Sequence, residues 1–160
     1  MEYPVKKLRY TEFGISHAEV PGESCLCIYI SGCLNKCPDC HYPLLQSPLE
    51  GEWLGTYYDD ILDLYSHLAT CVCFLGEGDL SAESRKEMMG YVEKAHDKGF
   101  SCCLYSGRDI EIEPWMKCFE YVKTGSYRKA LGGLEKNSTN QRLFKKVGNQ
   151  YIDITKSFSE

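Results

Sequence analysis

The chain has 160 residues, a net charge of −5 at pH 7 and a pI near 5.4, which fits a single domain over 1–160 with a core of its own. Its lysines and arginines are scattered, so the composition predicts no nucleic-acid partner. No apolar run approaches the roughly 20 residues needed to span a bilayer, and the N-terminus lacks the apolar core of a signal peptide, so we expect a cytoplasmic protein without a membrane partner.

The first half of the chain predicts two buried strands and one helix. Residues 1–23 mix charge, glycine and proline and indicate an opening strand or loop, and the apolar run at 25–30 is typical of a strand buried on both faces. Prolines and glycines within 41–55 exclude a long helix and predict an extended connection. Helical spacing of apolar residues follows at 56–68, and a second buried strand is expected at 71–75.

The second half repeats this alternation of helix and strand. Ser81 is a typical helix cap, and the helix that it begins should end at Gly99. A third buried strand is expected at 101–105. A short helix near 111–116 and a fourth strand at 118–122 come next.

Glycine and polar residues gather after the carboxyl ends of these strands, whereas the returning loops are plain turns. This asymmetry is typical of a barrel or parallel sheet with its site at the carboxyl edge. A full eight-unit barrel takes about 250 residues, so this chain has room for about five units. We therefore expect an α/β fold, a truncated and open (βα) partial barrel with parallel strands. Residues 141–147 and 150–154 should form a C-terminal hairpin that closes one edge.

The loop after the first buried strand contains Cys33, Cys37 and Cys40 in a C-x3-C-x2-C pattern. Thiolates are the soft ligands that select zinc or iron–sulfur clusters. Three cysteines leave one position open, either one iron of a four-iron cluster or one zinc position that is filled from elsewhere. His41 is adjacent to the third cysteine, and we interpret it as a neighbour of the metal rather than as a ligand.

This loop resembles the signature of the radical S-adenosylmethionine (SAM) superfamily. The short chain, the Gly-Cys-Leu-x-Lys-Cys sequence and the segment from Ser138 to Arg142 make it similar to activating enzymes of anaerobic (class III) ribonucleotide reductase. The resemblance implies a [4Fe-4S] cluster on the three cysteines, with SAM at its open iron. One electron from a flavodoxin- or ferredoxin-like donor would cleave SAM to a 5'-deoxyadenosyl radical, which would generate a glycyl radical on anaerobic ribonucleoside-triphosphate reductase.

The resemblance also implies contacts with SAM. The turn after the second buried strand resembles the family's glycine-glycine-acid segment, which receives the amino group of SAM, and either Glu77 or Asp79 fits the acidic part. Polar residues after the third and fourth strands are expected to line the ribose and the carboxylate. Ordinary turns that need positive φ are the alternative for these segments. The cofactor-binding residues implied in this way are Asp39, His41, Gly76, Glu77, Gly78, Asp79, Ser106 and Lys123. Asp39 stands where the family often has an aromatic residue, a position that packs against the adenine.

Seven cysteines lie outside the loop, and most of them fall inside apolar strands. There a free cysteine behaves as a small buried hydrophobe, with a second cluster or a redox pair as the alternative. A disulfide framework is disfavoured, since it requires an oxidising compartment. These cysteines are Cys25, Cys27, Cys71, Cys73, Cys102, Cys103 and Cys118. His17, His67 and His96 are isolated in the sequence, and we interpret them as surface or packed side chains.

The small size of the chain favours a protein as the target of the radical. We expect the reductase to insert a glycine-bearing loop through the lateral opening of the barrel. The rim that receives this loop is predicted to contain Tyr42, Leu44, Leu45, Asn140 and Arg142. Two alternatives are a radical SAM enzyme that acts on a small molecule, as the deazapurine synthases do, and a structural zinc-binding module.

Overall fold

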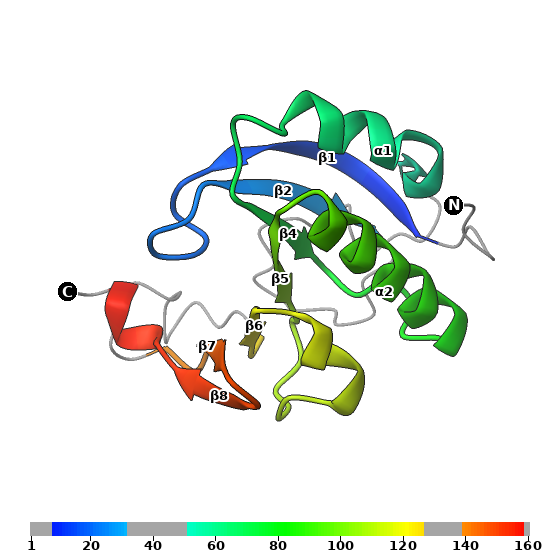
Figure 1. Ribbon diagram of the computed structural model, residues 1–160. Helices are drawn as coiled ribbons and strands as arrows, with labels where there is room; N and C mark the ends of the chain where they lie inside the picture. Colours follow the sequence, from blue (N-terminus) through cyan, green and yellow to red (C-terminus); the bar gives the residue numbers. More distant parts are fainter. Residues whose placement is uncertain (1–7, 32–50, 127–138, 159–160) are drawn as a thin grey trace.

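The structure is a computed structural model that describes residues 8–31, 51–126 and 139–158. Its centre is an eight-stranded mixed sheet with the strand order β3-β1-β2-β4-β5-β6-β7-β8 (Figure 1). The strands are β1 (Arg9–Ser16), β2 (Cys25–Ile30), β3 (Glu52–Trp53), β4 (Cys71–Leu75), β5 (Ser101–Tyr105), β6 (Tyr121–Thr124), β7 (Arg142–Val147) and β8 (Gln150–Asp153). The helices are α1 (Leu54–Leu64), α2 (Ala82–Asp97) and the short 3-10 helices η2 (Pro114–Cys118) and η3 (Thr155–Phe158).

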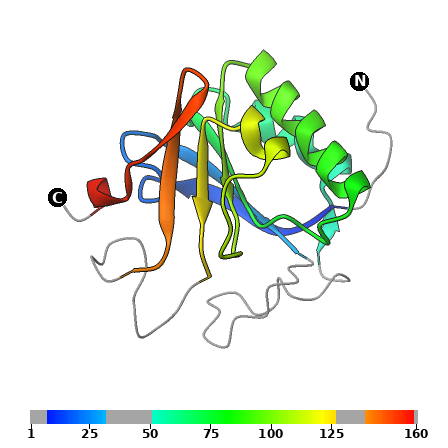
Figure 2. The same ribbon diagram turned by 90° about the horizontal axis from the view of Figure 1, so that it is seen from below.

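The four central strands β2, β4, β5 and β6 run parallel to one another. On one side β1 pairs antiparallel with β2, and β3 pairs antiparallel with β1. On the other side β7 and β8 form the expected hairpin, antiparallel to β6, around Gly148 and Asn149. Figure 1 shows the sheet curving from β1 to β8, with α1 and α2 on its outer side, and the view in Figure 2 agrees. The predicted α/β fold with parallel strands and a C-terminal hairpin is therefore confirmed.

Three details of the sequence prediction are wrong. The described part of the chain has four parallel strands and two α-helices rather than about five βα units. The last parallel strand begins at Tyr121 instead of 118, because the Phe119 amide donates to the Met116 carbonyl and keeps the chain turned until there. The helix that was expected near 111–116 is the 3-10 helix η2, which begins at Pro114, a residue suited to a first helical position.

The two helices follow their sequence signals closely. Ser81 caps α2, and its Oγ accepts a hydrogen bond from the Ser84 amide at 3.1 Å. The helix ends before Gly99, which has a positive φ, as the sequence predicted. The first helix, α1, ends four residues earlier than the predicted end at Leu68, because the amides of Leu68 and Ala69 both donate to the Tyr65 carbonyl and form a turn. None of the described helices is long and apolar enough to cross a membrane.

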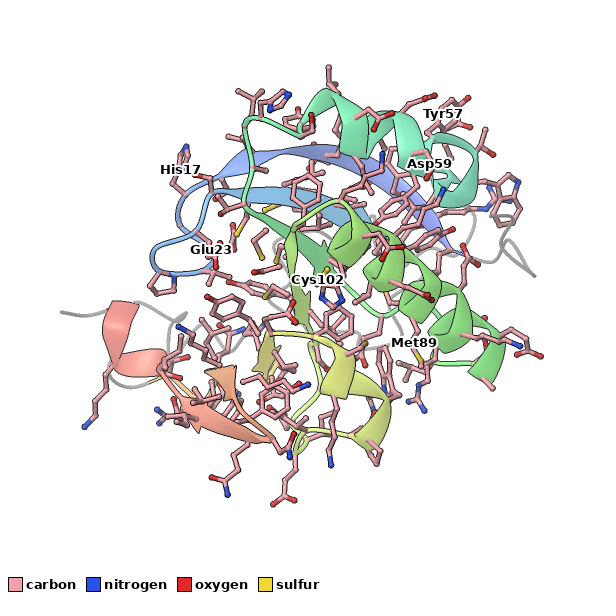
Figure 3. All side chains as sticks on the ribbon, viewed as in Figure 1. His17, Glu23, Tyr57, Asp59, Met89 and Cys102 are labelled. Atoms are coloured by element: carbon pink, nitrogen blue, oxygen red, sulfur yellow. The ribbon has the colours of Figure 1, made fainter. Side chains whose placement is uncertain are left out.

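Alternating side chains along each strand divide the core into two layers. The outer layer lies between the sheet and the helices and contains large residues such as Ile28, Phe74, Leu104 and Tyr91. The inner layer, on the helix-free face, consists of Val20, Cys25, Cys27, Cys71, Cys73, Cys103, Tyr121 and Leu143. The connection between β1 and β2, which carries Glu23 in Figure 3, covers part of this inner layer with the fully buried Val20.

Candidate functional site at the carboxyl edge of the sheet

The inner face of the sheet becomes polar toward the carboxyl ends of the parallel strands. The strand register sets Cys27, Cys73, Cys103 and Tyr121 side by side in one row. The next row toward the carboxyl edge contains Tyr29, Leu75, Tyr105 and Lys123. Just beyond it, the loops after β4 and β5 contribute Glu77 and Ser106, both buried. Buried polar groups converge at this edge, which is where ligands bind in parallel α/β sheets.

Glu77 is the centre of this edge, and its side chain is only 5% exposed. Its Oε1 accepts a hydrogen bond from Arg108 Nη2 at 2.6 Å, and its Oε2 accepts from Arg108 Nε at 3.0 Å and from Ser106 Oγ at 2.7 Å. These bonds join the loop after β4 to the loop after β5. A carboxylate has about four acceptor positions, so these three bonds leave room for one more donor at Oε1.

Arg108 extends the network outward to Glu113. The guanidinium donates to both oxygens of Glu113, through Nη2 at 2.8 Å and Nη1 at 3.2 Å, and Arg85 reaches the same carboxylate at 3.3 Å. Hydrogen bonds to Glu77 and then to Glu113 raise the pKa of Arg108 above its ordinary value. The bond from Arg108 in turn lowers the pKa of Glu113. The Glu113 carboxylate is therefore held as the anion.

The two glycines on either side of Glu77 both have positive φ angles, which glycine adopts without strain. Gly76 has φ +125° and Gly78 has φ +70°, and Leu80 also has a positive φ of 64°. A Cβ on Gly76 would lie 3.0 Å from the carbonyl oxygen of Ile30, so the backbone of this turn packs tightly against the end of β2. The interpretation of these glycines as a turn that needs positive φ is therefore confirmed, and the turn also places a buried acid at the edge.

The second candidate acid of this turn, Asp79, lies in a different environment. Asp79 is exposed, and its Oδ1 accepts hydrogen bonds from the Ser81 amide at 3.0 Å and from Ser84 Oγ at 2.7 Å. It thus binds the first turn of α2, a common role for an acid before a helix. Of the two acids, Glu77 is the one that joins the buried network with Ser106.

Lys123 brings a cation to the inner face of the same edge. It is 8% exposed, and its Nζ lies 5.0 Å from the ring centre of Tyr105. Its backbone carbonyl accepts a hydrogen bond from the Ser106 amide at 2.8 Å. Ser106 is thus bonded on one side to the backbone of β6 at Lys123 and on the other to the Glu77 side chain.

The predicted rim residues Asn140 and Arg142 have separate surroundings. Asn140 Nδ2 donates to Asp109 Oδ1 at 3.1 Å and to the Ser126 carbonyl at 2.9 Å, which joins the loops after β5 and β6 to the start of β7. Arg142 lies on the hairpin, 44% exposed, with its Nη1 3.8 Å from Asp153 Oδ2. Asn140 therefore belongs to the carboxyl edge, and Arg142 faces the neighbouring strand β8.

Several predicted site residues lie outside the described part of the chain. They are the three cysteines of the loop, Cys33, Cys37 and Cys40, and the adjoining Asp39, His41, Tyr42, Leu44 and Leu45. The segment that contains them follows Ser31, which comes directly after β2. The last residue of β2, Ile30, lies against the turn at Gly76, so the end of β2 is next to the Glu77 turn.

The sequence analysis missed Arg108 as a site residue. A signal was available, since Arg108 follows Ser106 by two residues after the carboxyl end of a predicted strand, and a buried acid at the same edge requires a cationic partner. Glu113 and Arg85 come from η2 and α2, and only the packing of these elements brings them to Arg108.

The cysteines outside the loop behave largely as the sequence predicted. Six of them are buried, Cys118 is half-buried, and all seven are free thiols. The register of the neighbouring strands sets Cys73 beside Cys27 and Cys103. Burial raises the pKa of Cys103 to about 11, so the thiol keeps its proton at neutral pH.

No protein-family model matches the chain, and neither a curated protein nor a solved structure matches it. The function therefore has to be argued from the residues and their geometry.

Proposed function

We propose that the chain is a radical SAM activase that generates a glycyl radical on anaerobic ribonucleoside-triphosphate reductase. The observation that carries the proposal is the C-x3-C-x2-C loop of Cys33, Cys37 and Cys40, which begins three residues after the end of the buried strand β2. Thiolates at this spacing suit a cluster with one open iron. In the proposed fold the curved sheet is an open partial barrel of the radical SAM type.

The residues at the carboxyl edge fit the methionine half of SAM, which carries an ammonium group and a carboxylate. Glu77 has one acceptor position left for an ammonium, and Arg108 and Ser106 fix its orientation. Lys123 provides a cation for the carboxylate from the neighbouring strand. The aromatic rings of Tyr29 and Tyr105 line the same row and would exclude water from the ligand. When a [4Fe-4S] cluster binds SAM, it supplies the one-electron cleavage that yields a 5'-deoxyadenosyl radical.

The partner in this proposal is a large reductase with a flavodoxin- or ferredoxin-like protein as electron donor. Hydrogen abstraction requires the reacting atoms to approach within about 3 to 3.5 Å, so the glycine-bearing loop of the reductase must enter the concave side of the sheet. A radical SAM enzyme that acts on a small molecule is the alternative, and the C-x3-C-x2-C loop suits it equally.

The first experiment tests the cluster. After anaerobic reconstitution with iron and sulfide, the protein should bind about four irons per chain and become brown. Cys33→Ala, Cys37→Ala and Cys40→Ala should each abolish iron binding and SAM cleavage. Cys71→Ala is the matched control, because it removes a buried thiol of the inner layer and should leave the cluster in place. A colourless protein that binds zinc tightly and takes up no iron would favour the structural zinc module.

The second experiment tests the ligand contact. Glu77→Gln should weaken SAM binding to the reduced cluster by about ten- to a hundredfold, since a charge-assisted hydrogen bond is lost, without changing the iron content. Asp79→Asn is the matched control and should bind SAM normally, because the Asp79 side chain is bonded to Ser81 and Ser84 at the start of α2. Binding is measured through the change that SAM causes in the electron paramagnetic resonance spectrum. Equal affinities in the wild type and Glu77→Gln would remove Glu77 from the pocket.

The third experiment tests the product. The chain, SAM, reductant and a class III reductase are incubated without oxygen, and 5'-deoxyadenosine and the glycyl radical doublet are followed together. Both should form in step, and deuterium at the target glycine should appear in the deoxyadenosine. SAM cleavage without a glycyl radical, together with conversion of a small heterocycle, would favour the small-molecule alternative.

A further inference from the structure

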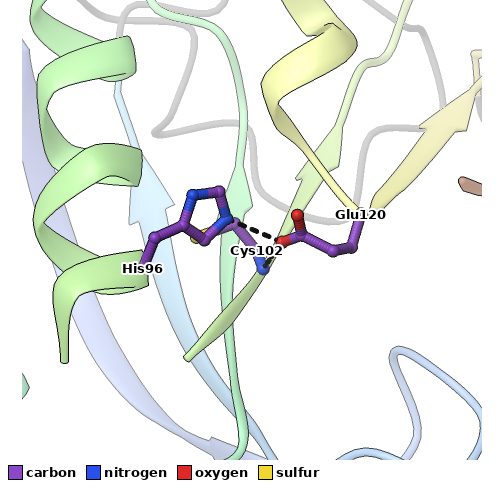
Figure 4. Close-up of side chains that lie close together, drawn as sticks. All are labelled: His96, Cys102 and Glu120. Carbon is purple, nitrogen blue, oxygen red and sulfur yellow. Dashed lines mark hydrogen bonds and ion pairs between the residues drawn. The ribbon is translucent and has the colours of Figure 1, made fainter. Parts of the chain in front are cut away.

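A second group of possible metal ligands lies at the opposite end of β5 from the carboxyl edge. It consists of His96 in the last turn of α2, Cys102 in β5 and Glu120 just before β6. One ligand atom from each of these three residues lies within 4.8 Å of the others (Figure 4). Figure 3 places Cys102 near the middle of the molecule, beneath α2. The three residues are separated in the sequence and meet only because α2 packs against the sheet.

Each of the three side chains is held in place by its surroundings. Glu120 Oε1 accepts a hydrogen bond from the Cys102 backbone amide at 2.7 Å and lies 2.8 Å from His96 Nε2. The Cys102 thiol is fully buried and faces α2, with its Sγ 4.0 Å from the Val92 carbonyl. His96 and Glu120 are 37% and 36% exposed, so two of the three donors face solvent and the thiol lies at the inner end of the group.

We infer that His96, Cys102 and Glu120 bind a divalent transition-metal ion, with Zn²⁺ as the best fit. The three donors are an imidazole nitrogen, a sulfur and a carboxylate oxygen, a set that suits zinc, whereas magnesium and calcium select oxygen. A thiolate and a carboxylate together balance the charge of the ion. The three protein ligands leave a fourth tetrahedral position for water on the exposed side.

The contact between His96 and Glu120 is close to the spacing that a zinc site requires. Zinc bonds of about 2.0 to 2.3 Å place neighbouring donors of a tetrahedral site roughly 3.4 to 3.6 Å apart. The contact between His96 and Glu120 would thus open by less than about 1 Å, which a change of side-chain rotamer can supply. Burial raises the pKa of Cys102, so the ion has to displace the thiol proton, as zinc does when it binds cysteine.

The inferred ion would connect the end of α2 to the adjacent ends of β5 and β6. The three ligands lie at the amino end of β5, whereas Ser106 and the Glu77 network lie beyond its carboxyl end. None of the three is part of the proposed SAM site. The inference therefore does not depend on the proposed function. It holds or fails whether the loop of Cys33, Cys37 and Cys40 carries a cluster or a zinc ion.

The test uses Co²⁺, which replaces zinc and absorbs in the near ultraviolet when a thiolate binds it. The full chain carries serine at Cys33, Cys37 and Cys40, so that the loop contributes no thiolate. Titration should give the charge-transfer band in this background. Cys102→Ser should abolish the band and weaken binding by more than about a hundredfold, since even changes outside the first shell cost ten- to a hundredfold.

Cys103→Ser is the matched control, because Cys103 adjoins Cys102 on β5 and is equally buried, but faces the inner layer. It should keep the band. His96→Ala changes a partly exposed side chain, so it should not disturb folding as a core substitution can. It should weaken cobalt binding, whereas the control His67→Ala should not. A band of equal strength in the background and in Cys102→Ser would overturn the inference, as would unchanged affinity in His96→Ala.

Discussion

The two faces of the sheet differ in the size and chemistry of their side chains. The outer face, beneath α1 and α2, is filled by aliphatic and aromatic residues such as Ile28, Phe74 and Leu104. The inner face carries a layer of thiols, with tyrosines and Lys123 closer to the carboxyl edge. Adjacent residues of one strand, Phe74 and Cys73, therefore belong to two different environments although both are fully buried.

This difference follows from the curvature of the sheet. Side chains on the concave face converge, so small residues fit there, whereas the convex face needs large residues to fill the space below the helices. At the carboxyl edge, the loops after β4, β5 and β6 supply hydrogen bonds to buried polar groups. We therefore expect the large side chains of the outer face to contribute more to stability than the small side chains of the inner face.

The largest expected effect tests this division directly. Phe74→Ala should destabilise the protein by about 3 to 5 kcal/mol, because it leaves a cavity between Tyr58 and Phe119, the rings that Phe74 contacts. Cys73→Ala, one residue away on the inner face, should cost only about 1 kcal/mol, because the side chain that it removes is small. Urea denaturation measures both free energies of unfolding. Equal losses would show that the two faces contribute alike.

The second prediction concerns the edge where the two faces meet. Gly76→Ala should cost about 1 to 3 kcal/mol, because φ +125° is strained for alanine and the added Cβ would lie 3.0 Å from the Ile30 carbonyl. Gly99→Ala is the control, since Gly99 also has a positive φ but open space around it, and its cost should be smaller. Thermal denaturation ranks the two variants, and a larger loss in Gly99→Ala would contradict the tight packing of β2 against this turn.

The smallest expected effect concerns the ion network on the outer side of the edge. Arg108 lowers the pKa of Glu113 in the folded state. The ion pair therefore stabilises the fold fully above the ordinary pKa of a glutamate, and this contribution is lost as the pH falls through the lowered pKa. The contribution should stay below about 1 kcal/mol, because the carboxylate is 30% exposed and solvent screens it. Between pH 6 and pH 3.5 the free energy of unfolding should fall more in the wild type than in Glu113→Gln. Equal falls in the two proteins would contradict this prediction.

The sequence predicted the buried parallel strands well but not the edges of the sheet. A continuous apolar run such as 25–30 marks a strand buried on both faces, although it does not say which residues face the helices. Strand β3 has two residues, so no periodicity could reveal it, and it exists only through its pairing with Arg9 and Tyr10 of β1. The start of β6 depends on the turn at Phe119, which is made by η2 rather than by the strand.

The part of the candidate site that depends only on the direction of the strands was predictable. Because parallel strands end at one edge, Glu77, Ser106 and Lys123 had to lie near one another. The choice between Glu77 and Asp79 as the buried acid was not predictable, because it depends on Asp79 binding the start of α2. The group of His96, Cys102 and Glu120 gave no signal in the sequence, since it is formed by packing between α2 and the strands.

The parallel pairing of β2 with β4 also has a consequence for the order of folding. The two strands begin beside Ser24 and Thr70, which are 46 residues apart and joined by hydrogen bonds. Such a pairing closes a long loop before its contacts stabilise it, so it forms later than local structure such as α2 or the β7–β8 hairpin. Until it forms, two apolar strands rich in cysteine have unpaired edges. Until β2 meets β4, we expect the chain to be more open to thiol oxidation and to edge-to-edge aggregation than the folded protein.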